Sequence, residues 1–242
     1  MIYAYRSEKG VRDHNEDSIF VPTKHEMSLA IVADGMGGHN AGNVASSLAV
    51  KTAAAELKRG GRGLPEILVH KAISKANTAV YELALKDSNL SGMGTTMVLA
   101  LPFRSRYIAA NVGDSRIYQI YSSGGMRQVT TDHSYVAELV ALGYITPEQA
   151  KTHPKRNLIT RALGTSQNEK IDITNETWDK DDVLVLCTDG LCGTLDDKVI
   201  ELTVREAATL DIAASMLVEK ALKAGSTDNI SVVLVQNTEV LL

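Results

Sequence analysis

The residues most able to do chemistry in this chain are aspartates that stand beside apolar runs. The hexapeptide Asp34-Gly35-Met36-Gly37-Gly38-His39 directly follows Leu29-Ala30-Ile31-Val32-Ala33, and such a continuous apolar run is typical of a buried strand. An unpaired carboxylate at the rim of a core is costly, and the three glycines allow the backbone itself to approach a ligand. Both features favour a cation bound at Asp34.

The same pattern recurs along the chain. Asp189 follows the apolar run 183–187, Asp114 lies between the runs 107–110 and 117–121, and Asp228 precedes 230–235. Near the N-terminus, Arg12 and the triplet Asn15-Glu16-Asp17 come just before the strand-like segment 18–21. We expect each acid to stand at a strand end. Strand ends from distant parts of a chain can converge at one edge of a sheet, and the acids could therefore share one site.

The chemistry of such a site follows from its oxygen donors. Carboxylates without clustered His or Cys favour Mg²⁺ or Mn²⁺ over zinc, and several carboxylates in one place could not all stay ionised without bound cations. Two ions roughly 3.5–4 Å apart can hold and acidify a bridging water and clamp an anionic substrate. Phosphate ester hydrolysis fits, with Arg12 gripping two phosphate oxygens. A single Asp-Gly is usually only a turn, and spacing alone leaves both readings open.

Composition narrows the class of protein. The chain has 242 residues, of which 44% are hydrophobic and 22% charged, as in a typical globular protein. A net charge of −4 argues against a general nucleic-acid binder. Two cysteines are too few for a disulfide framework. The N-terminus lacks the apolar core of a signal peptide, and no apolar run approaches the ~20 residues that span a membrane. We therefore expect a cytoplasmic monomer without a nucleic-acid partner or membrane segment.

The elements that must position these residues can be outlined from periodicity and turn signals. Neither a linker nor a repeat divides the sequence, so we expect one domain over residues 1–242. Helical patterns cover 41–59, 64–86, 134–142, 196–204 and 207–223, and Thr146-Pro147 begins a further helical turn. Strand patterns cover 95–101, 107–112, 116–121, 126–130, 171–177, 182–187 and 230–236. Strands adjacent in sequence and helices in pairs favour an α+β fold in which helices cover antiparallel sheets.

Taken together, the motifs resemble those of a known family. The ordered blocks are Gly10-x-Arg12-x-x-Asn15-Glu16-Asp17, Asp34-Gly35-Met36-Gly37-Gly38-His39, Gly94-Thr95-Thr96, Gly113-Asp114-Ser115-Arg116, Asp132-His133-Ser134, Thr188-Asp189-Gly190-Leu191 and Asp228-Asn229. This set resembles the metal-dependent type 2C serine/threonine protein phosphatases (the PPM family), in particular their compact bacterial branch, over essentially the whole chain. The resemblance implies a four-layer α-β-β-α sandwich, with two antiparallel sheets flanked by helix pairs.

The resemblance also implies roles for individual residues. By resemblance, Asp34 bridges two Mn²⁺ or Mg²⁺ ions. The Gly35 carbonyl would bind one of these ions, and Asp189 and Asp228 would bind the other. Arg12 would bind the substrate phosphate. Asp114, with Asp189, would form a third and weaker metal position.

Other residues would act around the ions. By resemblance, Glu16 and Asp17 hold metal-bound waters, and Asn229 orients the site. Residues 134–164 correspond to a mobile flap, whose Lys155 and Arg156 either contact a phosphoprotein or form a solvated basic loop.

One position departs from the family pattern. Many eukaryotic members carry a histidine directly after the Asp-Gly, as a candidate general acid for the leaving alkoxide. Met36 occupies that position here, and His39 follows three residues later. His39 is a candidate for orienting the site, and a water could donate the proton.

The resemblance implies an enzyme that hydrolyses phosphoserine and phosphothreonine on proteins without a covalent intermediate and that opposes a bacterial serine/threonine kinase. Two other functions stay open from the residues alone. One is a non-catalytic binding module, which usually loses metal ligands. The other is a hydrolase for nucleotides or small phosphate metabolites, because a fold does not fix a substrate.

Overall fold

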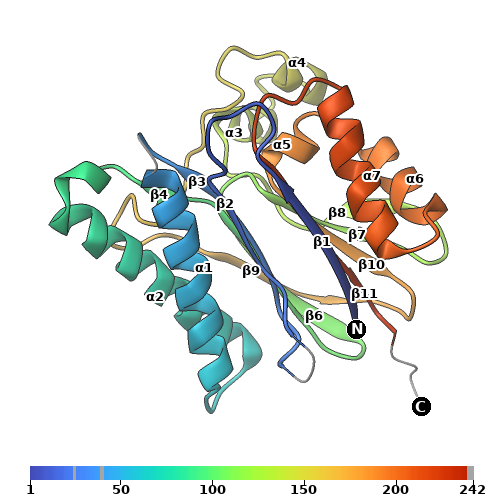
Figure 1. Ribbon diagram of the computed structural model, residues 1–242, viewed down its shortest axis with the longest axis horizontal. Coiled ribbons are helices and arrows are strands. Elements are labelled where there is room, and N and C mark those ends of the chain that lie inside the picture. Colours follow the sequence, from blue (N-terminus) through green and yellow to red (C-terminus); the bar gives the residue numbers. More distant parts are fainter. Residues whose placement is uncertain (24–25, 39–40, 239–242) are drawn as a thin grey trace.

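A computed structural model of the chain describes residues 1–23, 26–38 and 41–238. Two antiparallel sheets stack face to face, and helices cover both outer faces (Figure 1). The first sheet, called the β1 sheet, has the strand order β1-β11-β10-β7-β8. Its strands are β1 (Ile2–Glu8), β7 (Arg116–Ile120), β8 (Met126–Gln128), β10 (Val183–Cys187) and β11 (Ile230–Gln236).

The second sheet, called the β3 sheet, has the order β2-β3-β5-β6-β9, and β4 pairs with the end of β3. Its strands are β2 (Asp17–Phe20), β3 (Ala30–Met36), β4 (Gly94–Thr95), β5 (Met97–Pro102), β6 (Arg106–Val112) and β9 (Asp172–Thr177). The chain crosses from this sheet to the β1 sheet between β6 and β7. The turn that contains Asp114 makes this crossing, and it therefore stands between the two sheets.

Each sheet has its own helical cover. The long helices α1 (Ala41–Arg59) and α2 (Pro65–Lys86) pack on the β3 sheet, and a short 3₁₀ turn, η1 (Ser88–Leu90), follows them. On the β1 sheet lie α5 (Asp189–Cys192), α6 (Asp197–Glu206) and α7 (Leu210–Lys223). The short helices α3 (Tyr135–Ala141) and α4 (Pro147–Lys151), in the segment that was expected to be a flap, lie at one end of the sandwich, opposite the N-terminus in Figure 1.

The central strands β5 and β10, and β3 before Asp34, are apolar without interruption because both faces of each sheet are covered there. In β3, Ile31 and Ala33 pack toward the helices, whereas Ala30 and Val32 pack between the sheets against residues such as Leu184. A strand that is buried on both faces has no polar side. The apolar run before Asp34 therefore reflects a central strand in a four-layer structure.

The fold class agrees with the expectation from the sequence, but one local prediction needs correction and two elements were missed. Asp34 does not stand at the end of its strand, because Gly35 and Met36 continue β3 by pairing with Thr95 and Gly94 of β4. Neither β1 nor α5 was predicted. The strand β1 depends on its pairing with β11, in the register Ile2↔Gln236, which no local pattern encodes.

None of the helices in the described residues is long and apolar enough to cross a membrane.

Candidate metal centre

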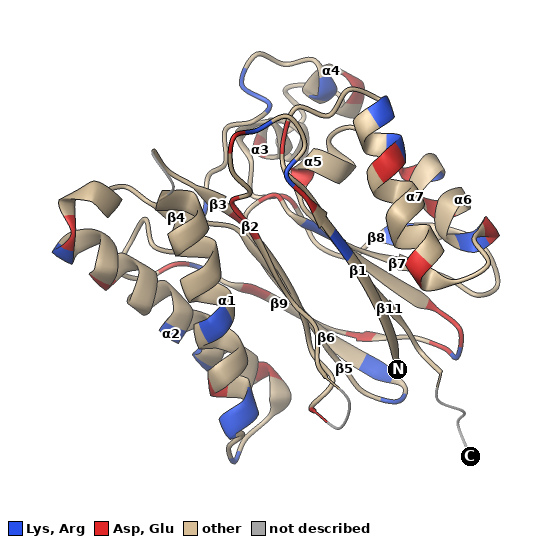
Figure 2. Cartoon of the chain, viewed as in Figure 1, with Lys and Arg blue, Asp and Glu red and all other residues tan. Residues whose placement is uncertain are grey.

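Except for Asp17, which is buried beside it, the predicted site residues that the structure describes line one cleft of about 310 Å³ at the end of the sandwich where α3 and α4 lie. Acidic segments of both sheets meet at this end of the molecule (Figure 2). The residues that line the cleft are Arg12, Glu16, Asp34, Gly35, Met36, Gly37, Thr96, Asp114, Asn157, Ile159, Asp189, Asp228 and Asn229. The acids that are far apart in the sequence are therefore brought together, as the sequence predicted.

Asp34 is fixed by its backbone. Its N–H donates to Thr96 Oγ1 at 2.9 Å, and its carbonyl oxygen accepts from Thr95 Oγ1 at 2.8 Å. The next residue, Gly35, lies against α1 so tightly that a Cβ would stand 2.0 Å from the Gly42 carbonyl oxygen. Only glycine lets β3 and α1 approach this closely, and the Asp34 carboxylate is thus presented from a rigid backbone.

Asp17 and Asp189 place incompletely paired carboxylates next to Asp34. In the pairing of β2 with β3, Asp17 lies directly opposite Asp34. Thr188 Oγ1 donates to Asp17 Oδ2 at 3.0 Å, and the carboxyl groups of Asp34 and Asp189 lie within hydrogen-bonding reach of each other. Among the described residues, the buried oxygens Asp17 Oδ1 and Asp189 Oδ1 have no hydrogen-bond partner. Buried carboxylate oxygens without donors mark a place for a cation.

Burial and mutual repulsion raise the pKa values of these acids. Burial, together with a smaller contribution from the charge of Asp189, raises the pKa of Asp17 and of Asp114 to about 7 each. The pKa of Asp34 lies well above its ordinary value, first through burial and then through the charges of Asp17, Asp189 and Asp228. Burial and Asp228 likewise raise the pKa of Asp189. The folded chain thus holds more acidic groups than it can keep ionised by itself.

Arg12 and Asp228 stand at the mouth of the cleft as an ion pair. Arg12 Nη2 lies 2.7 Å from Asp228 Oδ2, and Arg12 Nε donates to the Thr227 carbonyl oxygen at 3.0 Å. The Arg12 side chain is 53% exposed, so it faces the solvent from which a substrate would arrive. The two residues that the sequence assigned to phosphate and to metal therefore contact each other in this structure.

Asn229 holds the loop that carries Arg12. Its side chain is 4% exposed. Its Nδ2 donates to the carbonyl oxygens of Lys9 and His14 at 2.9 Å each, and its Oδ1 accepts from the Glu16 N–H at 2.8 Å. One buried amide thus ties both ends of the 9–16 loop to the start of β11.

The donor set fits divalent cations. It consists of hard oxygen ligands with orphaned buried atoms and unbalanced negative charge, the chemistry that Mg²⁺ and Mn²⁺ complement. In the described part of the chain, no three His, Cys, Asp or Glu side chains close around a single point as the ligands of one ion would. Asp228 in particular is held by Arg12. A metal centre would therefore need Asp228 to leave Arg12, and water or the Gly35 carbonyl to supply further oxygens.

Three further observations concern the predicted residues. Burial raises the pKa of Glu16, and the charge of Arg12 opposes this shift. His39 lies outside the described residues. Met36 lines the cleft at the position where a histidine would serve as an acid, and a thioether has no proton to donate.

The sequence did not single out every residue of the cleft wall. Thr96, Asn157 and Ile159 line the cleft. Thr96 falls in the block Gly94-Thr95-Thr96, and Asn157 and Ile159 fall in the segment 134–164 that was expected to be a flap. Thr96 both positions Asp34 and shares a 2.7 Å hydrogen bond with the Ser115 hydroxyl, beside Asp114. In the flap, Lys155 Nζ stands 5.2 Å from the centre of the Tyr135 ring, and the cleft itself receives Asn157 and Ile159.

Comparison with known proteins gives a consistent result. Residues 6–223 match the sequence model of the family described as protein phosphatase 2C. The serine/threonine phosphatase stp of Listeria innocua is 38% identical over 238 residues, which cover 96% of this chain and 94% of that protein.

Solved structures agree with the sequence comparison. The Mycobacterium tuberculosis serine/threonine phosphatase PstP/Ppp superposes with a TM-score of 0.90 at 35% identity and covers 99% of both chains. A structure of the PstP catalytic domain in complex with two manganese ions gives a TM-score of 0.85 at 35% identity over 96% of both chains.

Proposed function

Because the chain belongs to the protein phosphatase 2C family, we propose that its acidic cleft removes phosphate from phosphoserine and phosphothreonine side chains of proteins. The observation that carries this assignment to the cleft is the set of buried carboxylate oxygens without partners, contributed by both sheets. We further propose that residues 1–242 act as one catalytic domain and that residues 134–164 form its flap.

In this proposal Asp34, Asp189, Asp228 and the Gly35 carbonyl hold two divalent cations, and Asp114 with Asp189 holds a third and weaker one. When bound, such ions supply a water of lowered pKa and neutralise charge on the phosphate. Support comes from the high pKa values of Asp34 and Asp189 in the chain alone, because cations would relieve the repulsion that causes them.

The chain's own residues then bind and orient the substrate. Arg12, released from Asp228, would grip phosphate oxygens with its planar guanidinium. Glu16 and Asp17 stand beside the ligands, where their carboxylates can accept hydrogen bonds from water. Met36 cannot protonate the leaving alkoxide, and we assign that proton to a water in the cleft.

The biological setting is part of the proposal. We propose that the chain acts as a monomer on phosphoproteins and opposes a serine/threonine kinase. The proteins named serine/threonine phosphatase in Listeria and in Mycobacterium tuberculosis support the phosphoprotein substrate.

A metal-dependence assay tests the function. Metal-stripped protein would be given a phosphothreonine peptide with Mn²⁺, Mg²⁺, Ca²⁺ or no metal, beside the variant Asp34→Asn. We expect phosphate release with Mn²⁺ or Mg²⁺ and a loss of at least about 100-fold in the variant, the upper range for residues that only support a ligand. Nucleotides at equal concentration serve as the competing substrate class. Faster turnover of nucleotides, or undiminished activity of Asp34→Asn, would refute the assignment.

A further inference from the structure

The turn that carries Asp114 is held from both sides by two neighbouring residues, Asp132 and His133. Asp114 follows Gly113, whose φ of +107° is rare for any residue with a side chain, and a Cβ on Gly113 would stand 2.6 Å from the Thr96 Cβ. The direction of the Asp114 side chain therefore depends on how the Gly113 peptide is held.

His133 holds the Gly113 side of the turn. Gly113 N–H donates to His133 Nδ1 at 3.1 Å, and His133 N–H donates to the Gly113 carbonyl oxygen at 2.9 Å. Because Nδ1 accepts a hydrogen bond, the proton of the neutral ring is on Nε2, which lies 3.1 Å from Asp172 Oδ2 on β9. Arg161 Nη1 lies 3.0 Å from the same ring nitrogen and donates to Asp172 Oδ1 at 3.0 Å. The ring is 4% exposed. A buried imidazole with both nitrogens engaged is fixed in one orientation and one tautomer.

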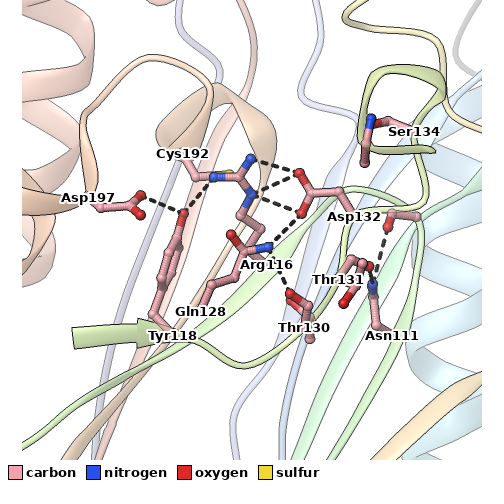
Figure 3. Close-up of polar contacts among 12 residues, drawn as sticks. Asn111, Arg116, Tyr118, Gln128, Thr130, Thr131, Asp132, Ser134, Cys192 and Asp197 are labelled. Atoms are coloured by element: carbon pink, nitrogen blue, oxygen red, sulfur yellow. Dashed lines mark hydrogen bonds and ion pairs between the residues drawn. The ribbon is translucent and has the colours of Figure 1, made fainter. Parts of the chain in front are cut away.

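Asp132 holds the other side of the turn through Arg116. Arg116 Nε and Nη2 donate to the Asp132 carboxylate at 2.7–3.0 Å, in the two-pronged arrangement that Figure 3 shows. Gln128 Nε2 donates to Asp132 Oδ1 at 2.8 Å, and Arg116 Nη1 donates to the Tyr118 hydroxyl. Asp132 is thereby anchored on β7 and β8 of the β1 sheet, whereas His133 is anchored on the β3 sheet.

The residues that hold this turn also begin the flap. Ser134 Oγ accepts from the Ala137 N–H at 3.3 Å as the N-cap of α3. The His133 carbonyl oxygen accepts from the Thr160 N–H at 2.8 Å, and Tyr135 N–H donates to the Leu158 carbonyl oxygen at 2.8 Å. The entry and the return of the flap are thus bonded to the tripeptide 132–134.

We propose that Asp132 and His133 are positioning residues that fix the Asp114 turn and couple it to the flap. The geometry carries this proposal, because the residues bonded to Gly113 and Arg116 are consecutive in sequence and lead directly into α3. A change in flap position would then change the orientation of Asp114, and a ligand on Asp114 would in turn order the flap. This inference rests on the proposed function only where Asp114 is taken as a metal ligand.

Two substitutions of His133 separate its two hydrogen bonds. In His133→Asn the side-chain oxygen can replace Nδ1 and accept from Gly113, whereas in His133→Gln the amide can replace Nε2–H and donate to Asp172. We expect His133→Gln to weaken the weakest Mn²⁺ site about 10-fold, as loss of a supporting partner typically does, and His133→Asn to stay within about twofold of the native chain. His70→Gln, on the exposed face of α2, is the control.

Two measurements that do not depend on turnover test the proposal. Mn²⁺ binding would be followed by electron paramagnetic resonance, and hydrogen exchange of the amides in residues 158–163 would be compared with and without Mn²⁺. We expect His133→Gln to speed flap exchange and to abolish its slowing by Mn²⁺. Equal effects of Asn and Gln, or flap exchange unchanged in both, would overturn the proposal. Should the native chain bind Mn²⁺ but release no phosphate, the proposed function fails, and these two readouts still decide the coupling.

A double-variant cycle tests whether His133 acts through Asp114. In an Asp114→Asn background we expect His133→Gln to cause no further loss of Mn²⁺ affinity, because residues that act through one another are not additive. Additive losses would show a general structural role and overturn the proposal. Arg116→Lys, which keeps the charge but loses the planar fork, covers the case in which His133→Gln does not fold. It should weaken Mn²⁺ binding in the same sense, and unchanged binding would count against the proposal.

Discussion

The two ends of strand β10 carry the same side chain in opposite circumstances. Asp182, just before the strand, is 2% exposed, and both of its oxygens are satisfied. Its Oδ1 accepts from the Ser122 N–H at 2.7 Å, and its Oδ2 accepts from Gln119 Nε2 at 2.9 Å and from the Asp179 N–H at 3.0 Å. Asp189, just after the strand, has a buried oxygen that none of the described residues contacts through a hydrogen bond.

The difference separates a carboxylate that holds the fold together from one that is kept for a ligand. At Asp182 the carboxylate accepts hydrogen bonds from two segments of the chain, 119–122 and Asp179, so its negative charge is satisfied inside the fold. At Asp189 the neighbours are other acids, and the pKa rises through burial and through Asp228. The fold tolerates this unfavourable burial and repulsion of carboxylates at one end of the sandwich, where a bound cation would relieve them.

The largest effect that we predict is on turnover at the ligand end. Asp189→Asn should lower phosphate release by at least about 100-fold, more than loss of a supporting residue would cause. The stability of the metal-free protein should equal or exceed that of the native chain, because a repelled charge is removed. Activity with Mn²⁺ and urea unfolding in chelator would measure the two effects. A variant that loses both activity and metal-free stability would show that Asp189 stabilises the fold, as Asp182 does.

The converse change is Asp182→Asn. We expect it to lower the free energy of unfolding by about 3 kcal/mol, because an amide NH₂ would face donors that had a charged acceptor. The kcat at 25 °C should stay close to the native value, since Asp182 lies at the other end of β10. Urea unfolding and a phosphopeptide assay check these expectations. If kcat falls while stability is kept, the comparison between the two ends is wrong.

A further prediction concerns how the stability of the metal-free protein depends on pH. Burial raises the pKa of Asp17 from the ordinary 3.8 to about 7. An acid that holds its proton more tightly when folded costs stability as pH rises between these two values. In chelator, Asp17→Asn should match the native chain at pH 4 and be more stable by up to about 4 kcal/mol at pH 8, because each unit by which folding raises the pKa corresponds to about 1.4 kcal/mol. Added Mn²⁺ should reverse the ranking at pH 8. A stability difference that does not change with pH would contradict the buried charge.

Local sequence patterns predicted some elements closely. The pair Thr146-Pro147 indicated a helix start, and α4 begins at Pro147 with a capping box between Thr146 and Gln149. The helical pattern over 64–86 corresponds to α2, which buries Val69, Ile73 and Val80, whereas Ile67 on the same helix is 59% exposed. Periodicity gives the direction of a face, but it does not show how far along the helix a neighbour covers it.

By itself the sequence determined the class of fold, the ordered motifs and the identity of the acids, because apolar runs, turns and carboxylate chemistry are local properties. It could not show that Arg12 pairs with Asp228, 216 residues away, or that Thr188 donates to Asp17 across 171 residues. It also gave no sign that Asp132 and His133 face different sheets. Those contacts depend on how the two sheets stack and where the chain crosses between them, so only the tertiary structure decided them.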